Sequence, residues 1–207
     1  RAGWGRCMSS SQDSPGRLRI AVAMLGARRH YAVPRILHDA GMLDCFFTDF
    51  NVNPSWCRSG LLLLPVLASA GMARLLERGA PGIPAEKVVS FPSLGLRRKV
   101  RNHFARTPSQ RLKAYCCWNE EFGRLVCEHW RDGPNTAYVF NAAGLEILEH
   151  ARSHGAQGIL DQTAAPWAVE EPLVEEERGL WPGWELGSTV PSDWQPLADR
   201  EKREWML

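Results

Sequence analysis

The sequence has no marked excess of charge of either sign, because 25 Lys and Arg face 23 Asp and Glu for a formal net charge of +2. That balance offers no electrostatic basis for a nucleic acid as the main partner. The apolar stretch over residues 61–76 is shorter than the roughly 20 residues needed to cross a bilayer. It predicts a core helix, with a helix in a membrane interface as the alternative. Residues 1–17 lack the apolar segment of a signal peptide and predict a disordered leader.

The cysteines show neither C-x-x-C spacing nor an accompanying set of histidines, so neither zinc nor any other metal site is indicated. The adjacent pair Cys116 and Cys117 is a poor candidate for a disulfide because the Cβ atoms of neighbouring residues point apart. We expect reduced, mostly buried thiols in a cytoplasmic protein. The six residues concerned are Cys7, Cys45, Cys57, Cys116, Cys117 and Cys127.

Short apolar runs alternate along the chain with segments whose apolar residues recur every three or four positions. The runs predict buried strands over residues 18–25, 43–49, 87–91, 136–140 and 157–160. The periodic segments predict helices over residues 31–40, 109–130, 142–154, 170–180 and 196–207. Since parallel strands need crossover connections, this order predicts an α/β fold with a Rossmann-like, doubly wound parallel sheet and helices on both faces.

Three charged segments predict helix faces in contact with solvent. They are the basic run over residues 97–106, the acidic run over residues 170–177, and the mixed charges over residues 199–204. For the basic run, contact with anionic lipid or phosphate is the alternative.

Ligands of parallel α/β sheets bind at the carboxyl ends of the strands. Gly26 follows the first predicted strand, where a glycine permits a tight turn and close approach of the backbone to a ligand. Arg28, Arg29 and His30 come next and are candidates for binding an anionic substrate group, although both arginines also suit an exposed surface. The G-x-G-x-x-G fingerprint is absent from this loop, which weakens a dinucleotide interpretation.

Two further loops follow predicted strands. Asn141 either lies close to a ligand or serves as the N-cap of the next helix. Asp161, Gln162 and Thr163 follow the fifth strand, where a buried carboxylate is costly unless it is paired or used. Asp161 is a candidate general base for a substrate hydroxyl, or else it caps the helix that follows.

Several segments resemble the acceptor-side domain of family 4 (group 1) glycosyltransferases of the GT-B type. They are residues 144–149, 159–163, 181–184 and 198–205, and residues 26–35 with Thr48 and Asp49 are similar to the same proteins. The resemblance covers residues 18–207 and implies one half of a GT-B fold. It places a polar residue, often histidine, near the reacting sugar where this chain has Asp161, and it matches Gly26 to a glycine loop.

The resemblance also implies an activity. Such enzymes transfer a hexose, with retention, from a nucleotide-diphosphate sugar to a carbohydrate or lipid-linked acceptor, and they require no divalent metal. The donor is bound by a C-terminal domain, which we expect to lie outside this chain, so the chain alone should be inactive. Family members act on membrane-associated acceptors, which implies peripheral contact with a membrane.

Two other functions stay open. A dinucleotide-dependent oxidoreductase domain would use an acidic residue about 20 positions after the glycine loop, a place that Asp44 and Asp49 approach. A non-catalytic sugar- or nucleotide-binding module would use the same edge of the sheet without chemistry.

Overall fold

The computed structural model describes residues 17–51, 79–184 and 194–207. Within these ranges, five strands form one parallel sheet in the order β3-β2-β1-β4-β5. The strands are β1 (Ile20–Met24), β2 (Leu43–Thr48), β3 (Val88–Ser90), β4 (Thr136–Phe140) and β5 (Gln157–Asp161). The predicted strand order along the chain is confirmed, with ends that shift by at most two residues.

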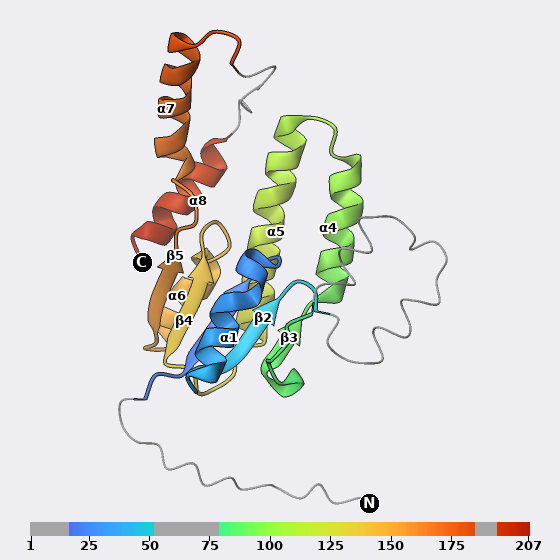
Figure 1. The fold of residues 1–207 in the computed structure, drawn as a ribbon, viewed down its shortest axis with the longest axis vertical. Helices are drawn as coiled ribbons and strands as arrows, with labels where there is room; N and C mark the ends of the chain where they lie inside the picture. Colours follow the sequence, from blue (N-terminus) through green and yellow to red (C-terminus); the bar gives the residue numbers. More distant parts are fainter. Residues whose placement is uncertain (1–16, 52–78, 185–193) are drawn as a thin grey trace, which may run out of the picture.

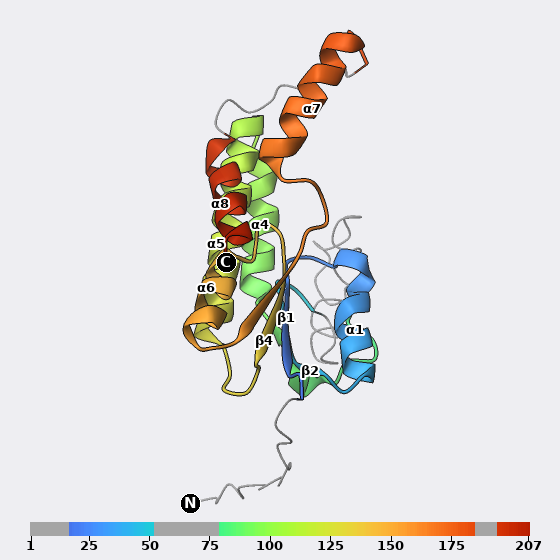
Figure 2. The same ribbon diagram turned by 90° about the vertical axis from the view of Figure 1, so that its left-hand side faces the viewer.

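Helices lie on both faces of this sheet, as Figure 2 shows from its edge. One face is covered by α1 (Ala32–Asp39). The other is covered by α4 (Pro92–Phe104), α5 (Pro108–Glu128) and α6 (Leu145–Ser153). The chain is therefore an α/β protein with a Rossmann-like, doubly wound sheet, as predicted.

The central strands are buried on both faces, which explains their continuous apolar runs. Every residue of β1 is buried, and alternate side chains enter two different clusters. Ala21 and Ala23 pack with α5 and α6, whereas Val22 and Met24 pack on the side of α1. Hydrophobic burial on both faces thus holds the helix layers against one sheet.

The prediction that the fifth strand is buried is wrong. β5 is an edge strand that pairs with β4, and its residues are exposed or half-buried, with Ile159 41% exposed. The helix after it, α7 (Trp167–Leu180), extends beyond the carboxyl edge of the sheet instead of returning over the strand (Figure 1). The exposure of β5 therefore follows from the path of α7.

The last helix, α8 (Gln195–Trp205), packs against α5, α6 and α7. The prediction that residues 199–204 form a solvent-facing surface is wrong for Arg200, Glu201 and Glu204, which are buried. The corresponding prediction for the basic run of α4 holds, since Arg97 and Arg101 are exposed. α8 differs because its charged side chains bind polar groups of the layer beneath it, as described below.

Some predictions lie outside the described residues. These are the leader up to residue 16, the apolar segment 61–76, and Cys7 and Cys57. The described cysteines are free thiols, and Cys45 alone among them is fully buried, which raises its pKa to about 12. The expectation of mostly buried thiols is therefore wrong for the exposed Cys117. Across the described ranges, no helix combines the length and apolar character needed to span a bilayer.

Candidate functional site

The sheet reverses its strand order between β1 and β4, because β2 and β3 extend to one side and β5 to the other. The loops that leave β1 and β4 diverge at such a point, and ligands of open α/β sheets bind there. The predicted loops beginning at Gly26, Asn141 and Asp161 all lie at this carboxyl edge, since their strands are parallel neighbours. The three residues therefore share one rim of the sheet.

Arg28 links the three loops. Its Nη1 atom donates to Asn141 Oδ1 at 3.1 Å and to Thr163 Oγ1 at 2.9 Å. The Thr163 hydroxyl in turn donates to Asn141 Oδ1 at 2.9 Å, and the guanidinium carbon lies 5.3 Å from the centroid of the Phe140 ring. Asn141 is therefore part of a polar cluster, and Gly144 instead occupies the N-cap position of α6.

Asp161 forms a second polar cluster beside the first. Its Oδ2 atom accepts a hydrogen bond from the Tyr138 hydroxyl at 2.7 Å, and its Oδ1 atom lies 3.4 Å from Arg29 Nη2. Burial and this hydrogen bond raise the pKa of Tyr138 to about 12, so its hydroxyl stays a donor. Pro166 precedes α7 at the N-cap position, so Asp161 does not cap that helix. Because its contact with Arg29 is long, Oδ1 can accept a further hydrogen bond.

The loop between β1 and α1 has an unusual backbone. Arg29, His30 and Tyr31 all have positive φ angles, of 50°, 49° and 59°. The left-handed region costs a non-glycine residue about 1–2 kcal/mol. The buried Tyr31 ring packs edge-on against Phe46, with 5.5 Å between centroids, and so fixes the turn from below. Arg29 and His30 are exposed. Strain of this kind is typical of binding loops held by their scaffold.

Gly26 has a φ of +84°, and its amide is bonded within the protein. The Gly26 N–H donates to Asp49 Oδ1 at 2.8 Å, and Arg98 Nη1 lies 3.4 Å from Asp49 Oδ2. Asp49 is 1% exposed, so its carboxylate is occupied within the protein. Asp44, at the start of β2, pairs with Arg19 at 2.8 Å at the opposite edge. The two acidic candidates for a dinucleotide ribose are therefore engaged elsewhere.

The N-terminus of α6 is closed by a residue of α8 that the sequence reasoning missed. The Glu204 carboxylate accepts hydrogen bonds from the backbone N–H groups of Ala142, Gly144 and Leu145 at 2.7, 3.0 and 3.1 Å. Burial raises the pKa of Glu204, an effect opposed by these hydrogen bonds and by the charge of Arg200. A carboxylate of the protein itself thus occupies the place where a helix N-terminus would bind an external anion.

Gln162 is predicted to bind substrate, but both polar atoms of its side-chain amide form hydrogen bonds within the chain. Its Nε2 atom donates to the Ala164 carbonyl at 2.6 Å, and Trp205 Nε1 donates to its Oε1 atom at 3.0 Å. Gln162 therefore ties the loop after β5 to α8. The structure brings Arg28, Arg29, Asn141, Asp161 and Thr163 together, while the exposed His30 lies in the same loop as the two arginines.

The fold and the site define a class: a Rossmann-like α/β domain with a polar cluster at the carboxyl edge of its sheet. Among residues 17–51, 79–184 and 194–207, no three His, Cys, Asp or Glu side chains lie together as a metal site would require. Searches of protein-family models, of curated proteins and of solved structures each found no match to this chain. The geometry of the site therefore carries the functional argument.

Proposed function

We propose that this chain is the acceptor-binding domain of a GT-B glycosyltransferase. A hexose would be transferred, with retention, from a nucleotide-diphosphate sugar to a carbohydrate or lipid-linked acceptor. The observation that carries the proposal is the pair of clusters at the strand-order reversal, where Arg28 bridges Asn141 and Thr163 and where Asp161 lies between Tyr138 and Arg29.

These clusters suit a ligand rich in hydroxyl groups. Asp161 supplies an acceptor oxygen with spare capacity, and the Arg28 guanidinium supplies N–H donors beyond the Nη1 group that bonds Asn141 and Thr163. A hydroxyl that donates to Asp161 Oδ1 would be oriented for attack and could pass its proton to the carboxylate. The positioning of the acceptor would be the main contribution of this domain.

The donor contacts belong to a second domain in this proposal. The N-terminus of α6 is filled by Glu204, which leaves no free helix dipole there for the diphosphate of a donor. We therefore expect negligible transfer by this chain alone. Sugar transfer by the purified chain that Asp161→Ala abolishes would contradict this division of roles.

Sugar binding is the direct test. Saturation-transfer NMR with a panel of mono- and disaccharides should detect weak binding that Asp161→Asn and Arg28→Met each reduce about tenfold, as expected for the loss of one charge-assisted hydrogen bond. Asp132→Asn is the matched control, because Asp132 is exposed and precedes β4 at the other edge of the sheet. Sugars that bind all four proteins equally, or saturable binding of NAD(P), would contradict the proposal.

Contact with a membrane is part of the same proposal. Leu96, Val100 and Phe104 lie four residues apart along α4 and are 53%, 52% and 69% exposed. Arginines flank this apolar stripe, which suits an interface with anionic lipid. We expect Val100→Asp to reduce co-sedimentation with phosphatidylglycerol vesicles, whereas Leu173→Asp on α7, which is also exposed, should not. Equal loss of vesicle binding in both variants would mean that the added negative charge, and not its position on α4, causes the effect.

A further inference from the structure

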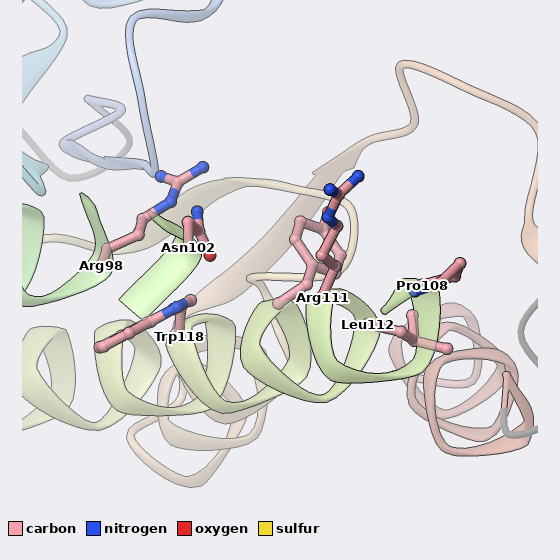
Figure 3. A pocket seen from close by; sticks show the side chains of 7 residues that line it. Arg98, Asn102, Pro108, Arg111, Leu112 and Trp118 are labelled. Atoms are coloured by element: carbon pink, nitrogen blue, oxygen red, sulfur yellow. The ribbon is translucent and has the colours of Figure 1, made fainter. Parts of the chain in front are cut away.

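A pocket opens between α4 and α5, apart from the clusters at the carboxyl edge of the sheet. It has a volume of about 550 Å³ and is lined by Arg98 and Asn102 from α4 and by Arg111, Tyr115 and Trp118 from α5. Figure 3 shows Arg98 and Arg111 extending their guanidinium groups on the same side of the helix pair, with Trp118 between the two helices. Pro108 and Leu112 add apolar surface at one end.

The pocket contains a buried donor without a partner. Trp118 is 2% exposed, and its indole Nε1 has no hydrogen-bond partner among the described residues. A buried N–H group left unpaired is costly, so native proteins satisfy nearly all of them. Arg101 lies against the indole, with its guanidinium carbon 5.6 Å from the ring centroid, so the ring has a fixed cationic neighbour. A ligand in the pocket could supply the missing acceptor.

Both lining arginines are anchored in a way that leaves guanidinium nitrogens for a ligand. Arg111 Nε donates to the Ala105 carbonyl at 3.2 Å. Arg98 contacts Asp49 through Nη1 at 3.4 Å. The described lining includes no acidic side chain. Arg111, an indole N–H and the Asn102 amide thus line the pocket together with Arg98, whose Nη1 contacts Asp49 from outside the lining. This set of donors favours an anion with several oxygens.

We propose that the pocket between α4 and α5 binds the phosphoryl group of a phosphorylated ligand. The oxygens of a phosphoryl group suit the arginine N–H donors that line the pocket, and the Tyr115, Leu112 and Pro108 side chains offer surface for the organic part of the ligand. The contact between Arg98 and Asp49, which also holds Gly26, places the pocket beside the loop after β1. This binding does not depend on sugar transfer at Asp161.

The test uses inorganic phosphate and pyrophosphate as probes at constant ionic strength. In the chain labelled with ¹⁵N-tryptophan, both salts should shift the Trp118 indole resonance, which is assigned with Trp118→Phe. Arg111→Met keeps the aliphatic stem and should weaken the binding about tenfold, the loss expected for one charge-assisted contact. Arg124→Met is the control, because Arg124 is exposed on the same helix and pairs with Glu128.

A second arm distinguishes the source of the phosphoryl group. If vesicles containing phosphatidic acid bind the wild type but not Arg111→Met, and free phosphate does not compete, the ligand is a lipid headgroup. If free phosphate competes, the ligand is a soluble phosphate ester. Equal weakening in Arg111→Met and Arg124→Met, or no Trp118 shift with any probe, overturns the proposal. Asp161→Asn should leave phosphate binding unchanged, which separates this outcome from the sugar-binding test.

Discussion

The helices α7 and α8 carry similar charged sequences and differ completely in burial. In α7, none of the residues is buried, and the helix extends away from the sheet (Figures 1 and 2). In α8, Arg200, Glu201 and Glu204 are buried at 9%, 5% and 2% exposure. A run of charges therefore does not by itself identify a solvent-facing helix. What decides is whether the neighbouring layer offers backbone groups and counter-charges that need a partner.

Removal of Glu204 should have the largest effect. Glu204→Ala leaves the N–H groups of Ala142, Gly144 and Leu145 unpaired and removes one of the two carboxylates beside Arg200. We expect a loss of about 3–5 kcal/mol in the free energy of unfolding, typical of breaking a buried charged network. Urea unfolding followed by far-UV circular dichroism measures it.

Glu176→Ala on α7 is the matched control, because Glu176 is exposed. A change within about 0.5 kcal/mol is expected for it. If both variants lose the same free energy of unfolding, the buried charges of α8 stabilise the protein no more than the exposed charges of α7.

Two arginines of α8 offer the next comparison. Arg200 Nη1 lies 2.6 Å from Glu146 Oε1, and its Nε donates to the Ala142 carbonyl at 2.6 Å. Arg203 lies 2.7 Å from Glu149, but both of those side chains are well exposed. We expect Arg200→Met to cost about 2–3 kcal/mol and Arg203→Met less than about 0.5 kcal/mol.

Double-mutant cycles with Glu146→Gln and Glu149→Gln would isolate each pair. The coupling energy should be about 1–3 kcal/mol for the buried pair and close to zero for the exposed one. A larger coupling for Arg203 with Glu149 would reverse the comparison.

The sequence allowed the fold to be predicted because its signals are local. β4 was predicted with the observed bounds, since an apolar run lies between turn residues and a helical pattern. The rim position of Asn141 and Asp161 followed from the parallel order of the strands alone. The side-chain pairs did not follow, because Tyr138 and Asp161 are 23 residues apart and Arg28 and Asn141 are 113 apart.

Glu204 shows why the contacts between distant segments were not predicted. Its hydrogen bond to Ala142 spans 62 residues, and its local sequence is that of an ordinary exposed helix. The unsatisfied groups that require it lie at the start of α6, where the backbone of Ala142 has a φ of 68°. Local periodicity does not report which distant helix will cover a helix N-terminus.

The pH dependence of stability should be a smaller effect. Burial raises the pKa of Glu201 and Glu204 above the ordinary value of 4.5. A carboxyl group of this kind contributes stability that is fully present below the unfolded pKa and is lost as the pH rises through the folded pKa. The wild type should therefore lose stability relative to Glu201→Gln/Glu204→Gln as the pH rises above 4.5.

Urea unfolding of both proteins in a series of buffers measures this difference. If the wild type instead gains stability relative to the double variant as the pH rises, the hydrogen bonds that the carboxylates accept from the Trp167 and Ala142 amides outweigh the effect of burial.

The smallest effect on global stability is expected in α7. Pro172 lies inside this helix and has no N–H to donate to the Ala168 carbonyl. Pro172→Ala should restore that hydrogen bond and slow amide exchange within α7. Because α7 buries none of its residues, its opening is a local event, and the midpoint of global unfolding should stay unchanged. Hydrogen–deuterium exchange with mass spectrometry reads both helices at once, with α8 as the internal control. Slower exchange in both helices, or a higher melting temperature, would mean that α7 unfolds together with the core and that its exposure does not make it independent.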